Sequence, residues 1–301
     1  MLVRINYVAV ILIWATTPLA IQLGGDTLAP IAGLTLRLAV ALMAGSLLLT
    51  LCGYAGLSFR RHWKIYFAAS ISLFPNMALV YQAAEYLPSG LIALLFGLSP
   101  FTTVLLSGPI LGESLLQPRK IIAILVALAG LLCILYDDIV VTGDSYRGIA
   151  LMLLSSVLFS SSALWVKKLN ATLAVEPMEQ TLGAMAFALP GLVVSWVLFY
   201  GVEPIVFSPV SLGSLLYLAL VASLFGFFAY YHILANMSVS AVSVIPLITP
   251  VLAMTLGVLI ADETLTGPMV AGAILILFAL LVHSGVRPQR ILPAGLRRLF
   301  G

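Results

Sequence analysis

The feature that most constrains this chain is a succession of apolar blocks, each about twenty residues long and followed by a short turn. Of its 301 residues, 62% are hydrophobic and only 8% are charged, whereas soluble domains average about 45–50% and about 25%. A helix needs roughly 20 apolar residues to cross the hydrocarbon core of a bilayer. The blocks use up the chain, so we expect an integral membrane protein whose main partner is the lipid bilayer.

Every block is expected to be a helix, because lipid offers no hydrogen-bond partner to an unpaired backbone group. The sequence therefore predicts an all-α membrane protein with ten transmembrane helices. Their expected ranges are 5–23, 29–52, 63–86, 88–111, 118–136, 147–166, 179–200, 211–236, 238–261 and 267–285.

The Lys and Arg residues between the blocks predict the orientation, since they concentrate in cytoplasmic loops. With the N-terminus inside, only Arg147 lies outside. The predicted inner residues are Arg4, Arg60, Arg61, Lys64, Arg119, Lys120, Lys167, Lys168, Arg287, Arg290, Arg297 and Arg298. The predicted outer acids are Asp26, Glu85, Asp137, Asp138, Asp144, Glu203, Asp262 and Glu263. Both termini are then cytoplasmic, in a bacterial inner membrane. Basic residues spread over loop ends do not form the single patch that nucleic acid needs.

The chain also repeats itself at a spacing of about 150 residues. This shift places Ser99-Pro100 on Thr249-Pro250, Glu113 on Glu263 and Tyr81 on Tyr231. We infer a first five-helix unit over 1–140, a second over 141–286 and a basic cytoplasmic tail over 287–301. Five is odd, so the second unit enters the membrane from the opposite side. Such inverted repeats are common in secondary transporters, which bind substrate near the midplane between the halves.

Two stretches carry a resemblance to a known family. Residues 78–135 resemble an EamA domain through Tyr81, Leu87-Pro88-Ser89-Gly90, Ser99-Pro100, Gly112-Glu113 and Ala129-Gly130. Residues 228–281 resemble a second copy through Leu247-Ile248-Thr249-Pro250 and Asp262-Glu263-Thr264, although Leu280 stands where the first copy has Gly130. The chain is thus similar to the drug/metabolite transporter superfamily. The resemblance implies a central cavity lined mostly by helices 1–4 and 6–9, with helices 5 and 10 as supports, and export of amino acids or other metabolites.

Arg37 is the sharpest single candidate for function. It lies in the middle of the second block, on one face with Gly33, Ala41 and Ala44. An Arg at the bilayer centre costs about 2.5–3.5 kcal/mol or more, so it should face protein or water. One interpretation is a tie between helices through backbone carbonyls. The other is a cavity cation that recognises a carboxylate or phosphate.

Further polar or aromatic side chains within the blocks are candidates for substrate binding: Trp14, Asn76, Tyr81, Gln82, Trp165, Tyr231 and His232. Asn76 follows Pro75, so it could equally mend the helix break that a proline causes. His232 is either a hydrogen-bonded structural group or a titrating one, and it is the central candidate for proton coupling. The tryptophans could stack on substrate or fill space. Pro100 and Pro250 could be hinges or merely shape the packing.

The sequence predicts transport rather than catalysis. The three His residues have no metal-ligand spacing, Cys52 and Cys133 predict neither a disulfide nor a metal site, and no phosphate-binding loop is present. We therefore predict no enzyme activity, no cofactor and a monomer that suffices for function. The predicted function is alternating-access export of a small-molecule substrate, such as an amino acid or another carboxylate. Efflux of amphipathic drugs or cations is the alternative, and a non-transporting membrane sensor is a further one.

Overall fold

The computed structural model describes residues 2–53, 56–112, 117–135, 144–200, 205–237, 242, 245–260 and 264–284. Within these ranges every regular element is a helix, which confirms the all-α class. Several residues named above lie outside the described residues: Glu113, Asp137, Asp138, Glu203, Asp262, Glu263 and the tail 287–301.

In the described part of the first half there are seven helical segments. They are α1 (Leu2–Gly24), α2 (Pro30–Leu51), α3 (Phe59–Ser70), α4 (Asn76–Ala83), α5 (Ser89–Phe96), α6 (Ser99–Leu111) and α7 (Pro118–Leu135). The third predicted block is divided between α3 and α4, because Pro75 has no N–H with which to continue the hydrogen-bond ladder. The fourth is divided between α5 and α6, just ahead of Pro100.

The described part of the second half consists of helices joined by short non-helical segments. It comprises α8 (Ser145–Leu173), α9 (Pro177–Ser195), the π-helix η1 (Trp196–Tyr200), α10 (Pro209–Leu216), the π-helix η2 (Tyr217–Phe225), α11 (Gly226–Asn236), α13 (Ile245–Ile260) and α14 (Gly267–Ser284). By length and composition, six described helical stretches can cross a membrane: Leu2–Gly24, Pro30–Leu51, Ser89–Leu111, Ser145–Leu173, Pro177–Leu198 and Pro209–Asn236.

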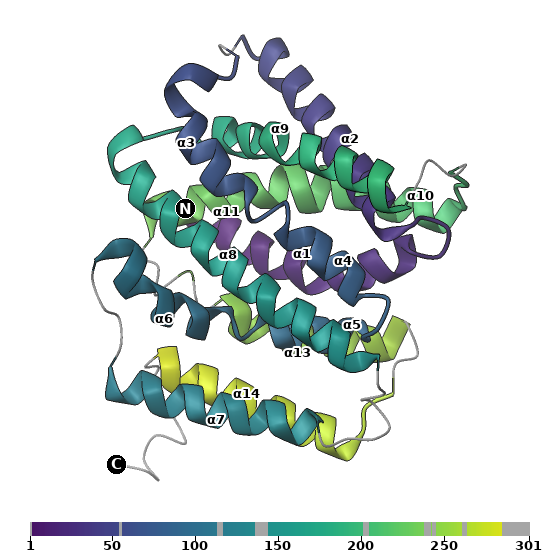
Figure 1. Cartoon of the computed structure of the whole chain (residues 1–301), viewed down its shortest axis with the longest axis vertical. Helices are drawn as coiled ribbons and strands as arrows, with labels where there is room; N and C mark the ends of the chain where they lie inside the picture. Colours follow the sequence, from purple (N-terminus) through teal and green to yellow (C-terminus); the bar gives the residue numbers. More distant parts are fainter. Residues whose placement is uncertain are drawn as a thin grey trace.

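Helices from the two halves interlock in one bundle (Figure 1). The helix α1 packs on α11 and α13, while α8 packs on α3, α4 and α6. The helices α7 and α14 lie side by side at one edge and pack mainly on each other. Gly130 permits this close approach, because a Cβ atom there would lie 2.8 Å from the carbonyl oxygen of Gly272.

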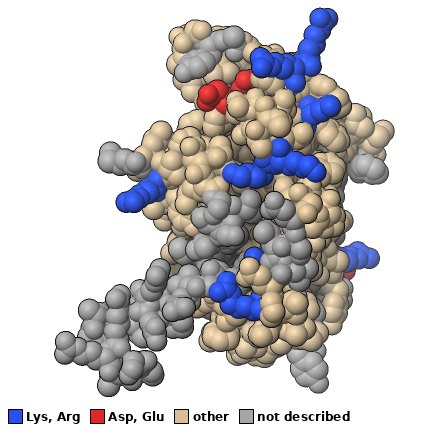
Figure 2. Space-filling model, turned by 90° about the vertical axis from the view of Figure 1, so that its left-hand side faces the viewer, with Lys and Arg blue, Asp and Glu red and all other residues tan. Residues whose placement is uncertain are grey.

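The bundle has two ends of different charge. At the basic end, α1, α3, α7 and α9 begin and α6, α8 and α11 terminate. Figure 2 views the molecule from this end and shows Lys and Arg side chains spread over it. At the opposite end, α1 and α4 terminate and α2, α8 and α10 begin, near Asp26, Glu85 and Asp144.

Candidate functional site

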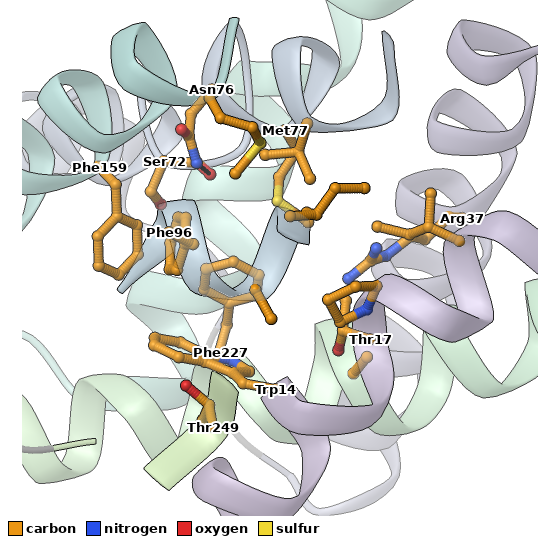
Figure 3. Close-up of a pocket in the computed structure, with 17 residues that line it drawn as sticks. Trp14, Thr17, Arg37, Ser72, Asn76, Met77, Phe96, Phe159, Phe227 and Thr249 are labelled. Atoms are coloured by element: carbon orange, nitrogen blue, oxygen red, sulfur yellow. Dashed lines mark hydrogen bonds between the residues drawn. The ribbon is translucent and has the colours of Figure 1, made fainter. Parts of the chain in front are cut away.

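A central cavity of about 70 Å³ lies between helices of both halves (Figure 3). Its lining comes from α1, α2, α4, α5, α8, η2, α11, α13 and the turn between α3 and α4. Most lining side chains are apolar, and the polar ones are Thr17, Arg37, Ser72, Asn76 and Thr249. Drug-sized ligand sites occupy about 300–1,000 Å³. The cavity is therefore smaller than a typical drug-sized site.

Arg37 supplies the charge in this cavity. Its side chain is almost wholly buried, at 1% exposure. Its Nε donates to the Ser223 hydroxyl at 2.6 Å and a terminal nitrogen donates to the Tyr81 hydroxyl at 3.3 Å. A guanidinium has five N–H donors, so these two acceptors leave donors for a ligand. Its described hydrogen bonds go to hydroxyls rather than to backbone carbonyls, and no described carboxylate forms an ion pair with it.

Tyr81 packs beside the small residues of α2 that share a face with Arg37. A Cβ atom on Gly33 would lie 3.8 Å from the Tyr81 ring, and Ala41 is fully buried. The Tyr81 ring centre lies 5.9 Å from the guanidinium carbon. Tyr81 comes from α4 and Ser223 from η2, so both halves of the chain hold the cation in place.

An aromatic cluster forms another part of the cavity wall, and Figure 3 shows Arg37 and Phe159 on opposite sides. The ring of Trp14 lies 6.2 Å from Phe96, 5.6 Å from Phe159 and 5.1 Å from Tyr230, between ring centres. The contacts with Phe96 and Phe159 are edge-on, which is a preferred arrangement of aromatic rings. The cavity thus combines a cationic side with an aromatic side.

Asn76 also borders the cavity, but both ends of its amide are engaged. Its nitrogen donates to the Ser72 carbonyl at 2.9 Å, and its oxygen accepts the Ser155 hydroxyl at 2.7 Å. The backbone N–H of Asn76 bonds instead to Ile71, one residue further back, at 3.3 Å. The side chain therefore satisfies a carbonyl that the break at Pro75 would otherwise leave open.

Trp14, Arg37 and Asn76 line the central cavity, and Tyr81 bonds to Arg37 while lining a neighbouring cavity. The other candidates lie elsewhere. The Tyr231 hydroxyl is 3.4 Å from Ser72 Oγ and from the Ala69 carbonyl, and its ring lines a different cavity. His232 lies at the basic end, where its Nδ1 is 3.0 Å from the Asn6 amide.

The remaining candidates are also away from the central cavity. Gln82 lines a groove at the opposite end together with Glu85 and Arg147. Trp165 is 41% exposed on the surface of α8. Pro100 is the second residue of α6, and Pro250 lies inside α13.

The sequence analysis missed a polar cluster at the basic end. Nδ1 of His62 lies 2.7 Å from Glu179 Oε1, and the Tyr66 hydroxyl donates to the same oxygen. These bonds join α3 of the first half to α9 of the second. The available signal was a His and an acid near the starts of two apolar blocks, one in each half. The sequence analysis considered His62 only for metal binding.

Comparison with known proteins gives the chain relatives. The family model described as "EamA-like transporter family" matches residues 4–136 and again 146–285. A protein of Escherichia coli (strain K12) named "Probable amino-acid metabolite efflux pump" is 26% identical over 232 residues, covering 74% of this chain and 77% of the relative. Its Salmonella typhimurium namesake is also 26% identical, over 226 residues, with 72% and 75% covered.

Two other relatives extend this comparison. "Protein PecM" of Dickeya dadantii is 24% identical over 226 residues, with 74% of each chain covered. A crystal structure of a protein superposes with a TM-score of 0.69 at 21% identity, over 93% of this chain and 96% of that one, which supports the fold. The two family matches cover nearly the whole sequence and confirm the resemblance inferred from its motifs. They point to a transporter rather than an enzyme, and the chain belongs to the EamA-like transporter family.

Proposed function

We propose that this protein is a secondary transporter that exports small carboxylate-bearing metabolites, such as amino acids, by alternating access. The observation that carries the proposal is the buried Arg37 on the cavity wall, which has no described counter-ion. Burying an unpaired cation is unfavourable, so such a group usually marks a pathway for substrate. A carboxylate fits the planar donor fork of a guanidinium with two parallel hydrogen bonds.

The rest of the cavity narrows the substrate class. Its wall is mainly apolar, and an aromatic cluster lies across from the cation. A preferred substrate therefore combines a carboxylate with an apolar or aromatic body. The relatives with efflux in their names support export as the direction. A monomer suffices in this proposal, since the described lining residues come from both halves of one chain.

Ten spans in two inverted units, 1–140 and 141–286, are part of this proposal. Helix contacts support them, because they recur when the halves are exchanged. The pair α1–α13 corresponds to α8–α6, α1–α11 to α8–α4, and α2–η2 to α9–α3. Two units related in this way can rock about a site between them.

The proposed orientation places the basic end in the cytoplasm of a bacterial cell, in the inner membrane. The positive-inside rule and the Lys and Arg side chains in Figure 2 support this assignment. The opposite end, with Asp26, Glu85 and Asp144, then faces outward.

Efflux of amphipathic cations is the second candidate, and the aromatic cluster around Trp14 favours it. Aromatic faces attract cations. Arg37 opposes it, because a like charge in a small apolar cavity repels the substrate.

Counterflow in proteoliposomes tests the proposal with two matched probes, labelled phenylalanine and labelled phenethylamine, which lacks the carboxylate. We expect flux of phenylalanine only, and Arg37→Gln should lower it by about 10- to 100-fold, because a hydrogen bond to a charged group contributes about 1.5–3 kcal/mol. Arg147→Gln is the control, since Arg147 is 73% exposed in its side chain. Phenethylamine flux that survives Arg37→Gln would favour cation efflux. Binding without flux of any carboxylate would indicate a sensor.

A further inference from the structure

A second polar cavity lies at the basic end, between α8, α9 and α11. Its volume is about 140 Å³, and its polar lining residues are Lys167, Asn170, Gln180 and Tyr231. It is separate from the central cavity. Tyr231 links the two, because its ring lines this cavity while its hydroxyl lies 3.4 Å from Ser72, which lines the central one.

Three of these side chains offer hydrogen-bond donors. Nζ of Lys167 donates to the carbonyls of Leu234 at 2.7 Å and Met237 at 3.1 Å. An ammonium group has three donors, so one remains. The Asn170 amide oxygen accepts the backbone N–H of Val175 at 2.8 Å, which leaves the NH₂ group as its donor end.

Gln180 provides the independent sign of a ligand. The residue is 1% exposed, and its amide nitrogen has no hydrogen-bond partner. More than about 90% of buried polar groups in proteins are satisfied, and leaving one unpaired costs about 1–3 kcal/mol. A ligand oxygen that enters the cavity would supply the missing acceptor.

The charge around this cavity selects an anion. No acid is among the described lining residues, and Lys167 contributes a positive charge. The nearest acid along α9 is Glu179, but its carboxylate is bound by His62 and Tyr66 from α3. The site therefore offers donors and a cation without a built-in counter-ion.

We propose that this cavity is a second binding site for the carboxylate of the substrate, which it occupies before passing Tyr231 to reach Arg37. This inference rests on the proposed export of carboxylates. The cavity is smaller than the roughly 300–1,000 Å³ of drug-sized sites, so it holds the carboxylate head while the remainder of the substrate projects toward the basic end. The unpaired Gln180 amide is satisfied only in the loaded state.

Acetate is a suitable probe because it is a carboxylate head alone. Thermal unfolding of the purified full-length Arg37→Gln variant is measured in sodium acetate and in sodium chloride at equal ionic strength. A ligand that binds only the folded state raises the melting temperature by mass action. We expect acetate to stabilise Arg37→Gln, and the gain to disappear in the double variant Arg37→Gln/Gln180→Leu. Leu has a similar volume and removes the unpaired amide, so the fold should tolerate it.

Transport kinetics give the second measurement. Gln180→Leu alone should raise the KM for phenylalanine by about tenfold with little change in the maximal rate, since a charge-assisted hydrogen bond is lost at loading. Lys167→Met should act in the same direction. If acetate does not raise the melting temperature of Arg37→Gln, or still raises that of the double variant, the proposed carboxylate site at the basic end is overturned. If the wild-type protein shows no flux but acetate still stabilises it in a Gln180-dependent way, the carboxylate site at the basic end stands and the proposed export fails.

Discussion

Two tyrosines that a shift of 150 residues aligns, Tyr81 and Tyr231, meet different partners. The Tyr81 hydroxyl accepts a hydrogen bond from the Arg37 guanidinium at 3.3 Å. The Tyr231 hydroxyl lies 3.4 Å from the neutral groups of Ser72 and Ala69. The two halves thus each contribute a tyrosine, but of the two hydroxyls only that of Tyr81 bonds to a charged group among the described contacts.

The two ends of the bundle differ in how firmly they join the halves. At the basic end the halves are joined by His62 and Glu179, by Asn6 and His232 at 3.0 Å, and by Lys168 and the Ile110 carbonyl at 2.6 Å. At the opposite end, Thr27 donates to Ser211 at 2.7 Å, beside a cavity of about 330 Å³. Among the described residues, an ion pair joins the two halves at the basic end only, and this end would have to open for substrate to load there.

Among changes to these contacts between the halves, the largest effect is expected from Glu179→Gln, which weakens the bonds between α3 and α9. The neutral amide loses the charge that strengthens both hydrogen bonds, so the basic end should open more often. Val166→Cys, in a background without Cys52 and Cys133, reports opening of this end. Val166 is 2% exposed and lines the cavity at the basic end between α8, α9 and α11. We expect a charged methanethiosulfonate to label it about tenfold faster.

Glu176→Gln is the matched control for this measurement. Glu176 is an exposed acid three residues earlier, at the start of the same helix, with no side-chain capping bond. It should leave the labelling rate unchanged. Equal rates in the two variants would show that Glu179 does not hold the basic end closed.

Gly183→Ala disturbs the packing of the basic end. A Cβ atom at Gly183 would lie 2.3 Å from the Tyr66 ring, whereas one at Gly24 would meet only the Ser214 Cβ, at 3.5 Å. Overpacking typically costs about 1–3 kcal/mol. We expect Gly183→Ala to lower the thermal unfolding midpoint in detergent and Gly24→Ala to leave it nearly unchanged. Equal unfolding midpoints in the Gly183→Ala and Gly24→Ala variants would mean that α3 and α9 can move apart at no cost in stability.

The sequence predicted those features that depend on residue type alone. Apolar blocks must be helical in lipid, and the burial of Arg37 follows from the energetic cost of an exposed cation there. It could not predict partners such as Ser223, which is 186 residues from Arg37 and reaches it only through packing. Trp165 shows a second limit. Both the lipid-facing and the core-facing sides of a membrane helix are apolar, so hydropathy could not place it on the surface of α8.

Position along a helix explains the missed cluster. Charged residues near the ends of membrane helices are ordinary, because their side chains can reach the interface. The positions of His62 and Glu179 near the starts of two blocks were therefore only a weak signal, and folding brings the two side chains within 2.7 Å of each other. For His232 the sequence suggested a central position. It lies instead near the end of α11, where its Nδ1 is 3.0 Å from the Asn6 amide, a contact that the sequence could not reveal.

Tyr81→Phe should have a moderate effect on transport. It removes one of the two hydroxyls that hold Arg37, while the ring stays 5.9 Å from the guanidinium carbon. A net contribution of about 0.5–1.5 kcal/mol per hydrogen bond corresponds to a loss of roughly 2- to 10-fold in phenylalanine flux. Ser223→Ala removes the other acceptor and should be at least as harmful, because its bond is shorter, at 2.6 Å. Unaltered flux in both variants would mean that Arg37 needs no positioning.

Tyr231→Phe should have the smallest effect, and it sharpens the comparison between the two tyrosines. The hydroxyl contacts of Tyr231 are at the long limit of hydrogen-bond distance, at 3.4 Å, and involve no charge. We expect phenylalanine flux within about twofold of wild type, because weak neutral bonds contribute little net free energy. A loss as large as that of Tyr81→Phe would contradict this expectation, because transport would then depend equally on both hydroxyls.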